Sequence, residues 1–218
     1  RFLDSEWKPD ILRASINESF EAFDAVGAPS TWVLSNHDII RHASRMGGLT
    51  GRPTASNGIG PNDPQPDREL GLRRARGATL FTLALPGSMY LYQGEELGLP
   101  EHTTLAPEYR QDPTFFRTNG ERVGRDGCRV PLPWESGAGA ANGFNKTGKS
   151  WLPQPEIYAA YSRDQQNGVA GSTLELYKHA LKLRKKLRIG EGSFEWVKEF
   201  VSDHSLGFRN GEILVVHN

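Results

Sequence analysis

The sequence predicts an α/β protein in which parallel strands are joined through a helix, with a short antiparallel β region at the end. Two apolar stretches rich in β-forming residues, 30–35 and 88–93, flank a helical pattern at 68–85. Strand, helix and strand in this order predict a βαβ unit, whose parent is a parallel sheet or a barrel. Both strands run into polar residues, so we expect two polar clusters at the same edge of the sheet.

Two more helices are indicated by apolar residues that recur every three or four positions. The first spans residues 7–23, where Leu12, Ile16 and Phe20 share a face. The second spans residues 172–187 and has a basic last turn, which complements the helix dipole. We prefer this interpretation to a nucleic-acid-binding patch because the chain has no basic surplus elsewhere.

The periodicity changes near Gly192. Asn210 and Gly211 lie between two apolar runs, which is a strong signal for a β-hairpin. We therefore divide the chain into an α/β domain over residues 1–191 and the start of an antiparallel β domain over residues 192–218. The sequence begins with Arg rather than Met and ends in a strand-like run, so we expect it to be a piece of a longer protein.

The composition excludes several classes of function. The 218 residues contain 26 basic and 26 acidic side chains, so the net charge gives no reason to expect nucleic acid or an anionic membrane as partner. No apolar run approaches the roughly 18 residues of a membrane-spanning helix. The single cysteine, Cys128, excludes an intrachain disulfide and a metal site built from cysteines.

The polar residues after the first strand are the strongest candidates for chemistry. Ser35, Asn36, His37 and Asp38 follow the apolar run 31–34 directly. In parallel sheets and barrels the C-terminal strand ends meet the ligand, which favours a binding or catalytic role. The alternative is an Asn/Asp turn in which Asp38 caps the next segment.

Two long segments, 41–67 and 97–164, show neither helical nor strand periodicity. Loops of this length within a compact domain are uncommon and often functional, and a disordered tether is the alternative for the first. The second contains aromatic residues that suit either stacking on sugar rings or ordinary loop anchoring, namely Trp134, Phe144, Trp151 and Tyr158.

Three motifs and one helix, taken in order, resemble the α-amylase superfamily of family 13 glycoside hydrolases. They are SNHD (35–38), the helix (68–85), YLYQGEELG (90–98) and RDGCRVPLPW (125–134). The likeness is greatest to the bacterial α-glucosidase and oligo-1,6-glucosidase branch and covers essentially the whole chain. It implies the C-terminal part of a (β/α)8 TIM barrel, from about strand seven to helix eight, followed by the start of an antiparallel β-sandwich.

The resemblance also implies roles for individual residues. Asp38 matches the family's third catalytic carboxylate, which stabilises the oxocarbenium-like transition state by holding hydroxyls of the reacting glucose. His37 matches the adjacent substrate-binding histidine, and Arg129 matches the arginine beside the non-reducing glucose. An ion pair that shapes the loop is the alternative for Arg129. The family pattern gives Glu95 and Glu96 no direct chemical role, so we expect them to be structural.

The implied function is that of a retaining α-glucosidase fragment acting on small α-glucosides or on malto- and isomalto-oligosaccharides. We expect no cofactor, no metal site in this segment, no nucleic-acid or membrane partner, and a cytoplasmic location. Two alternatives stay open, a glucosyl-transferring isomerase of the sucrose isomerase type and a non-catalytic α-glucosidase-like subunit. Intact His37, Asp38 and Arg129 argue against the second of these.

We expect the chain by itself to be inactive. The family's nucleophile Asp and acid/base Glu belong to the fourth and fifth strands, which would precede residue 1, and two strands leave an open sheet edge and an exposed core face. The isolated chain should release no glucose from α-glucosides and show no cooperative thermal transition in calorimetry. Cooperative unfolding together with glucose release would contradict this expectation.

Overall fold

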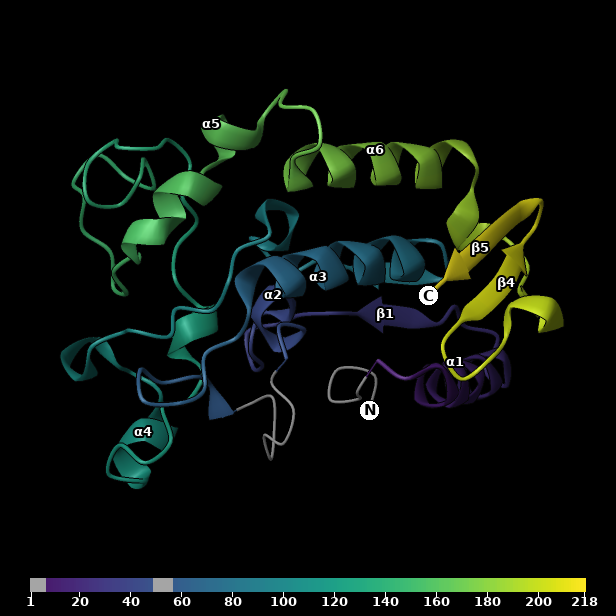
Figure 1. Ribbon diagram of the computed structural model, residues 1–218, viewed down its shortest axis with the longest axis horizontal. Coiled ribbons are helices and arrows are strands. Elements are labelled where there is room, and N and C mark those ends of the chain that lie inside the picture. Colours follow the sequence, from purple (N-terminus) through teal and green to yellow (C-terminus); the bar gives the residue numbers. More distant parts are fainter. Residues whose placement is uncertain (1–6, 49–56) are drawn as a thin grey trace. The chain divides into compact units, whose positions relative to one another are not determined.

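The computed structural model describes residues 7–48 and 57–218, which form two compact units (Figure 1). Within these residues the first unit comprises 7–34, 77–90 and 178–218, and the second comprises 35–48, 57–76 and 91–177. Residues 1–6 of the predicted α/β domain and residues 49–56 of the predicted loop lie outside the described residues.

A parallel strand pair organises the first unit. β1 (Thr31–Val33) pairs with β2 (Ser88–Tyr90), and Trp32 lies opposite Met89. Helix α3 (Arg68–Leu83) lies between the two strands in the sequence, so the predicted βαβ unit is confirmed. Each strand has three residues rather than the six predicted, because the chain leaves the sheet close to where the polar residues begin.

The two other predicted helices are also confirmed. They are α1 (Pro9–Asp24) and α6 (Thr173–Lys186). Pro9 is the first residue of α1, a position where its missing N–H costs no intrahelical hydrogen bond. The buried residues of α1 are Leu12 and Ile16, four positions apart on the face that the sequence pattern identified.

The C-terminal region is a three-stranded antiparallel sheet in the order β3-β4-β5. Its strands are β3 (Glu195–Trp196), β4 (Leu206–Asn210) and β5 (Ile213–His217). The predicted hairpin is confirmed, and its turn contains Gly211 at a φ of 60°, a left-handed conformation that suits glycine. A domain boundary near Gly192 remains a prediction.

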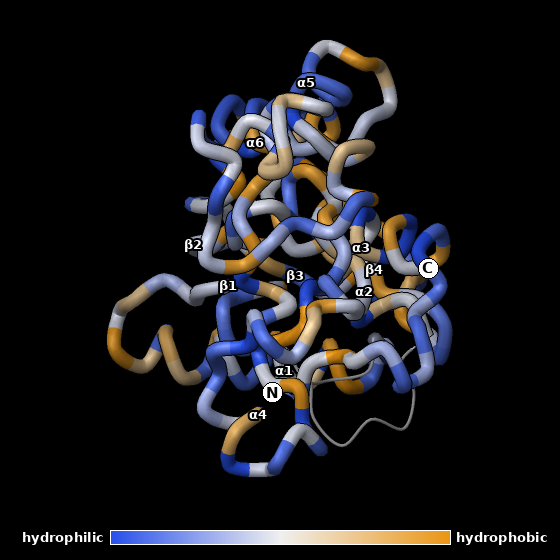
Figure 2. The backbone as a smooth tube through the Cα atoms, turned by 90° about the vertical axis from the view of Figure 1, so that its left-hand side faces the viewer, coloured by the Kyte–Doolittle hydropathy of each residue, from blue (hydrophilic) through white to orange (hydrophobic). Residues whose placement is uncertain are grey.

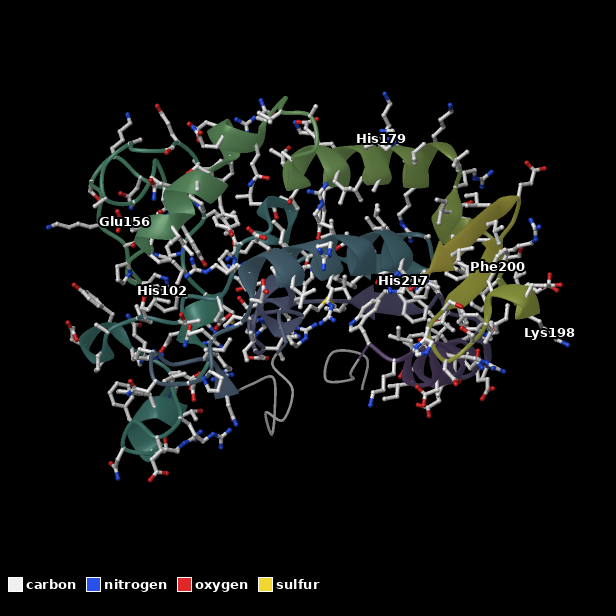
Figure 3. All side chains as sticks on the ribbon, viewed as in Figure 1. His102, Glu156, His179, Lys198, Phe200 and His217 are labelled. Atoms are coloured by element: carbon white, nitrogen blue, oxygen red, sulfur yellow. The ribbon has the colours of Figure 1, made fainter. Side chains whose placement is uncertain are left out.

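An aromatic core joins the elements of the first unit. The Phe81 ring lies with its centroid 5.3 Å from that of Phe208 on β4 and 5.2 Å from that of His217, which is labelled in Figure 3. The Trp32 indole Nε1 donates to the Pro86 carbonyl at 2.7 Å within this core. Its buried members come from α1, β1, α3, the segment after α3, and β4: Leu12, Ile16, Trp32, Phe81, Leu85, Leu206 and Phe208. Two short helical turns complete the unit, Ile189–Glu191 and Lys198–Phe200.

The second unit consists mostly of loops that carry short helices. The segments predicted to be irregular do contain helical turns, so that prediction was too coarse. These turns are α2 (His42–Arg45), α4 (Pro113–Arg117), α5 (Arg163–Gln166), which extends past residue 164, and the 3₁₀ turns Pro107–Tyr109, Asp126–Cys128 and Glu156–Tyr161. A further 3₁₀ turn, Glu95–Leu97, lies in the polar run after β2. These turns have three to six residues, and a helical segment that short has too few residues to show a repeating apolar face in the sequence.

The second unit has its own small core. The buried members are Leu97, Leu99, Leu105, Val130, Leu152 and Tyr158.

Figure 2 shows hydrophobic stretches that are short and interrupted by hydrophilic residues along most of the backbone. Among the helices of residues 7–48 and 57–218, none combines the length and apolar character that a bilayer crossing requires.

Two tryptophans allow a matched test of this core. Trp32→Phe removes the buried hydrogen bond to the Pro86 carbonyl, whereas Trp196→Phe removes a part-buried one, from Nε1 to Asn17 Oδ1 at 2.9 Å. A buried acceptor left without a donor costs about 1–3 kcal/mol, while a part-exposed one can turn to water. We expect Trp32→Phe to lower the free energy of unfolding of the full-length protein by at least about 1 kcal/mol more than Trp196→Phe. Equal losses in denaturant titrations would contradict this.

Candidate active site

The polar stretch after β1 forms a turn that presents two side chains. Asn36 Oδ1 accepts a hydrogen bond from the Asp38 amide at 2.8 Å. The sequence allowed a turn in which Asp38 caps the following segment, but Asn36 makes the turn and the Asp38 carboxylate contacts other side chains. The side chains of His37 and Asp38 are 68% and 48% exposed, and His37 Nε2 lies 3.4 Å from Asp38 Oδ2. Both side chains are therefore available to a ligand.

Two arginines converge on the Asp38 carboxylate. Arg125 Nη1 donates to Asp38 Oδ1 at 2.7 Å, and Arg129 Nη2 donates to the same oxygen at 3.2 Å. Arg129 Nε also donates to the His37 carbonyl at 2.8 Å. The structure thus brings together His37, Asp38 and Arg129, the three site residues named from the sequence. Sequence reasoning missed Arg125, although it is the first letter of the RDGCRVPLPW motif.

Arg125 also contacts a buried carboxylate, that of Asp112. Asp112 is 1% exposed, and its Oδ2 accepts hydrogen bonds from Arg125 Nε at 2.6 Å and from the Arg125 amide at 2.8 Å. Burial by itself raises the pKa of Asp112, but the hydrogen bonds from Arg125 and Thr114 outweigh it and hold that pKa well below its usual range. The same contact with Asp112 raises the pKa of Arg125, so both partners are ionised at neutral pH.

Beneath the exposed turn lies a buried charged residue, Arg41. Its amide donates to Glu101 Oε2 at 3.0 Å, and its Nη1 donates to the Gln93 carbonyl at 2.8 Å. The guanidinium carbon lies 5.2 Å from the centroid of the Tyr92 ring, a cation–π contact. These contacts tie the segment after β1 to the segment after β2. His102, labelled in Figure 3, is also buried, and burial lowers its pKa to about 4.

His42 and Glu95 form a second buried pair. His42 Nδ1 lies 3.8 Å from Glu95 Oε2 and 2.8 Å from the Ser35 hydroxyl. Burial lowers the pKa of His42 to about 3 and raises the pKa of Glu95 to about 8. Both groups are therefore neutral at pH 7, and their contact is not an ion pair. The Tyr177 hydroxyl lies 3.5 Å from Glu95 Oε1 and donates to it, so Glu95 contacts side chains of the interior and not the exposed turn.

Glu96 and the aromatic residues of the segment 97–164 differ in their surroundings. Glu96 Oε2 accepts from the Gly94 amide at 2.8 Å, a local structural contact of the kind expected. Tyr158 is buried and donates to the Pro100 carbonyl, so among the aromatic residues it is an anchor and not a sugar-stacking surface. The other three aromatic residues considered for sugar stacking, Trp134, Phe144 and Trp151, are exposed.

The arrangement suits recognition of neutral polyhydroxy ligands. An exposed carboxylate accepts hydrogen bonds from ligand hydroxyls. The guanidinium N–H groups that do not contact this carboxylate can donate to other hydroxyls of the same ligand. In the part of the chain that the structure describes, no three His, Cys, Asp or Glu side chains are grouped so that they could hold a metal ion. The chemistry that these residues can supply is hydrogen bonding and charge.

The model of the alpha amylase catalytic domain matches residues 5–191, and the chain therefore belongs to the alpha-amylase family. The family and the fold class expected from the sequence motifs are confirmed.

Similar proteins carry related names. The chain is 31% identical over 168 residues to a probable alpha-glucosidase of Rhizobium meliloti, a match that covers 77% of this chain and 26% of that protein. It is 27% identical over 200 residues to an oligo-1,6-glucosidase of Saccharomyces cerevisiae, covering 80% and 31%. The chain thus spans between a quarter and a third of the length of these relatives.

Solved structures of similar fold agree. An alpha-glucosyl transfer enzyme superimposes with a TM-score of 0.70 at 28% identity, over 99% of this chain and 36% of that one. The trehalose-6-phosphate hydrolase of Bacillus licheniformis reaches a TM-score of 0.69 at 21% identity, over 96% of this chain and 38% of that one, which shows likeness of fold alone.

The buried Glu95 gives a pH-dependent prediction. The folded protein keeps its proton up to about pH 8, whereas the unfolded chain releases it above its ordinary pKa of 4.5. This group's contribution to stability is therefore complete below pH 4.5 and is lost as the pH rises towards 8. Glu95→Gln removes the titration, so the variant should gain at least about 2 kcal/mol relative to the wild type between about pH 5 and pH 8. Parallel stability curves in denaturant titrations would refute the assignment.

Proposed function

We propose that the chain is the C-terminal part of a retaining α-glucosidase that removes terminal glucose from small α-glucosides, including malto- and isomalto-oligosaccharides. Residues 1–191 would complete its barrel and residues 192–218 would open a following β domain. The observation that carries the proposal is the half-exposed Asp38 carboxylate, contacted by both arginines of the RDGCRVPLPW motif. A cytoplasmic location belongs to the same proposal and is testable by cell fractionation.

In this proposal Asp38 acts on the sugar without forming a bond to it. Its carboxylate accepts hydrogen bonds from hydroxyls of the reacting glucose, and its negative charge favours the positive charge that develops on the ring. His37, mostly exposed beside it, donates to a hydroxyl of the same ring. The nucleophile and the acid/base that retention requires would come from the part of the protein before residue 1.

In this proposal Arg129 contacts the non-reducing end of the bound sugar. Two of its five N–H donors already contact Asp38 and the His37 carbonyl, so its side chain is oriented before substrate arrives. The remaining donors make no hydrogen bond to residues 7–48 or 57–218 and could bind oxygens at the non-reducing end of the sugar. A guanidinium held in this way would favour substrates that end in an unsubstituted glucose.

A second candidate is glucosyl transfer, as in sucrose isomerases. The likeness of fold and sequence to an alpha-glucosyl transfer enzyme supports keeping it. The two functions share every step up to the covalent glucosyl intermediate and differ in whether water or a sugar hydroxyl attacks it. The test is the product profile of the full-length protein on maltose and sucrose. Free glucose as the main product supports hydrolysis, and isomeric disaccharides support transfer.

Asp38→Asn in the full-length protein tests the role of this carboxylate. The amide keeps the shape of the side chain but loses the charge, so kcat/KM on an aryl α-glucoside should fall by an amount equivalent to at least roughly 3 kcal/mol. Glu96→Gln makes the same chemical change in a carboxylate with a local structural contact, and should leave kcat/KM close to that of the wild type. Near wild-type kcat/KM for Asp38→Asn would remove Asp38 from its assigned role.

A further inference from the structure

We propose that Asp112 is a positioning residue, whose buried carboxylate holds Arg125 so that the guanidinium reaches Asp38. This inference rests on the proposed function and extends its site to two residues that the sequence motifs did not assign. Arg125 would be the contact with Asp38, and Asp112 would act only through Arg125.

The Arg125 guanidinium lies between two carboxylates. Asp112 Oδ2 receives the Arg125 amide at 2.8 Å and Nε at 2.6 Å, while Nη1 at the outer end of the same guanidinium reaches Asp38 Oδ1 at 2.7 Å. The planar guanidinium thus spans two carboxylates, one on each side. Since Nε and the amide are both fixed by Asp112, little freedom is left in the direction of Nη1.

The two carboxylates that contact Arg125 differ in exposure. The Asp112 side chain is fully buried and that of Arg125 is 33% exposed, whereas Asp38 is 48% exposed. A buried carboxylate that loses its cation is costly, so Asp112 strongly favours the one Arg125 orientation that satisfies it. An exposed ion pair is weak by comparison and would not by itself fix Arg125.

The surrounding loop packs closely around the Asp112 carboxylate. Asp112 Oδ1 also caps α4 by accepting from the Thr114 amide at 2.9 Å. At Gly124, which has a φ of +72°, an added Cβ would lie 2.8 Å from the Asp112 Cβ and Cγ. The backbone of this loop therefore approaches the carboxylate closely enough to prevent it from moving.

The test is a double-mutant cycle in the full-length protein, with kcat/KM measured on an aryl α-glucoside. Asp112→Asn loses the charge that holds Nε, and a misplaced guanidinium should lower kcat/KM about tenfold or more. Arg125→Gln should cause a similar loss. If Asp112 acts through Arg125, Asp112→Asn should cause no further loss in the Arg125→Gln background.

Two controls separate positioning from general damage. Asp126→Asn changes another buried carboxylate of the same loop, whose Oδ2 accepts only from the Gln111 and Asp112 amides among its described contacts. It should lower the melting temperature as Asp112→Asn does, but keep kcat/KM close to the wild type. Arg125→Lys serves if Asp112→Asn does not fold, because one ammonium cannot span both carboxylates, and it should reproduce the loss.

The outcomes distinguish the two proposals. An inactive wild-type protein overturns the proposed function and this inference together. An active wild type in which the two losses multiply, or in which Asp126→Asn loses as much kcat/KM as Asp112→Asn, overturns the positioning role alone. The positioning role of Asp112 is supported if the wild type is active, the losses of kcat/KM from Asp112→Asn and Arg125→Gln are not additive, and Asp126→Asn leaves kcat/KM close to that of the wild type.

Discussion

The burial of Arg41 is the constraint on which the second unit depends. Taking a guanidinium out of water is costly unless polar partners surround it. In the segment that follows β2, the Gln93 carbonyl accepts from Nη1 and the Tyr92 ring lies against the guanidinium, while Nε and Nη2 are buried without a hydrogen-bond partner among the described residues. The Arg41 amide donates separately to Glu101 Oε2. Because Arg41 is only three residues from Asp38, these contacts also hold the backbone from which Asp38 projects.

Burial shifts the pKa values of the neighbouring acidic and basic groups in opposite directions, and for Glu95 and Glu101 this outweighs the Arg41 charge, which lowers the pKa of both. Burial raises the pKa of Glu101 to about 7 and that of Glu95 to about 8, while it lowers the pKa of His42 to about 3. The interior thus avoids additional charges by keeping Glu95 and His42 neutral near pH 7. At the exposed turn, by contrast, Asp38 forms salt bridges with Arg125 and Arg129.

Elements with a repeating apolar face or a characteristic turn sequence could be predicted from the sequence, whereas contacts between residues of different long loops could not. Helices α1, α3 and α6 have repeating apolar faces, and the hairpin has Asn210 and Gly211 at its turn, so each was recognised. The site residues His37, Asp38 and Arg129 came from motif likeness, and their roles remain predictions. Arg125 was missed because its partners, Asp112 and Asp38, lie 13 and 87 positions away, and no period connects them.

The two carboxylates that share Arg125 differ in how easily they can change partners. Exposed ion pairs contribute roughly 0–1 kcal/mol, so Asp38 can exchange part of its contact with the arginines for sugar hydroxyls at little cost. Asp112 has no such freedom, since its buried charge must keep Arg125. A guanidinium anchored on its buried side and exchangeable on its exposed side keeps its place whether or not a sugar is bound. The geometry around Asp38 would then be set before substrate arrives, which is the condition under which a charge is most effective on a transition state.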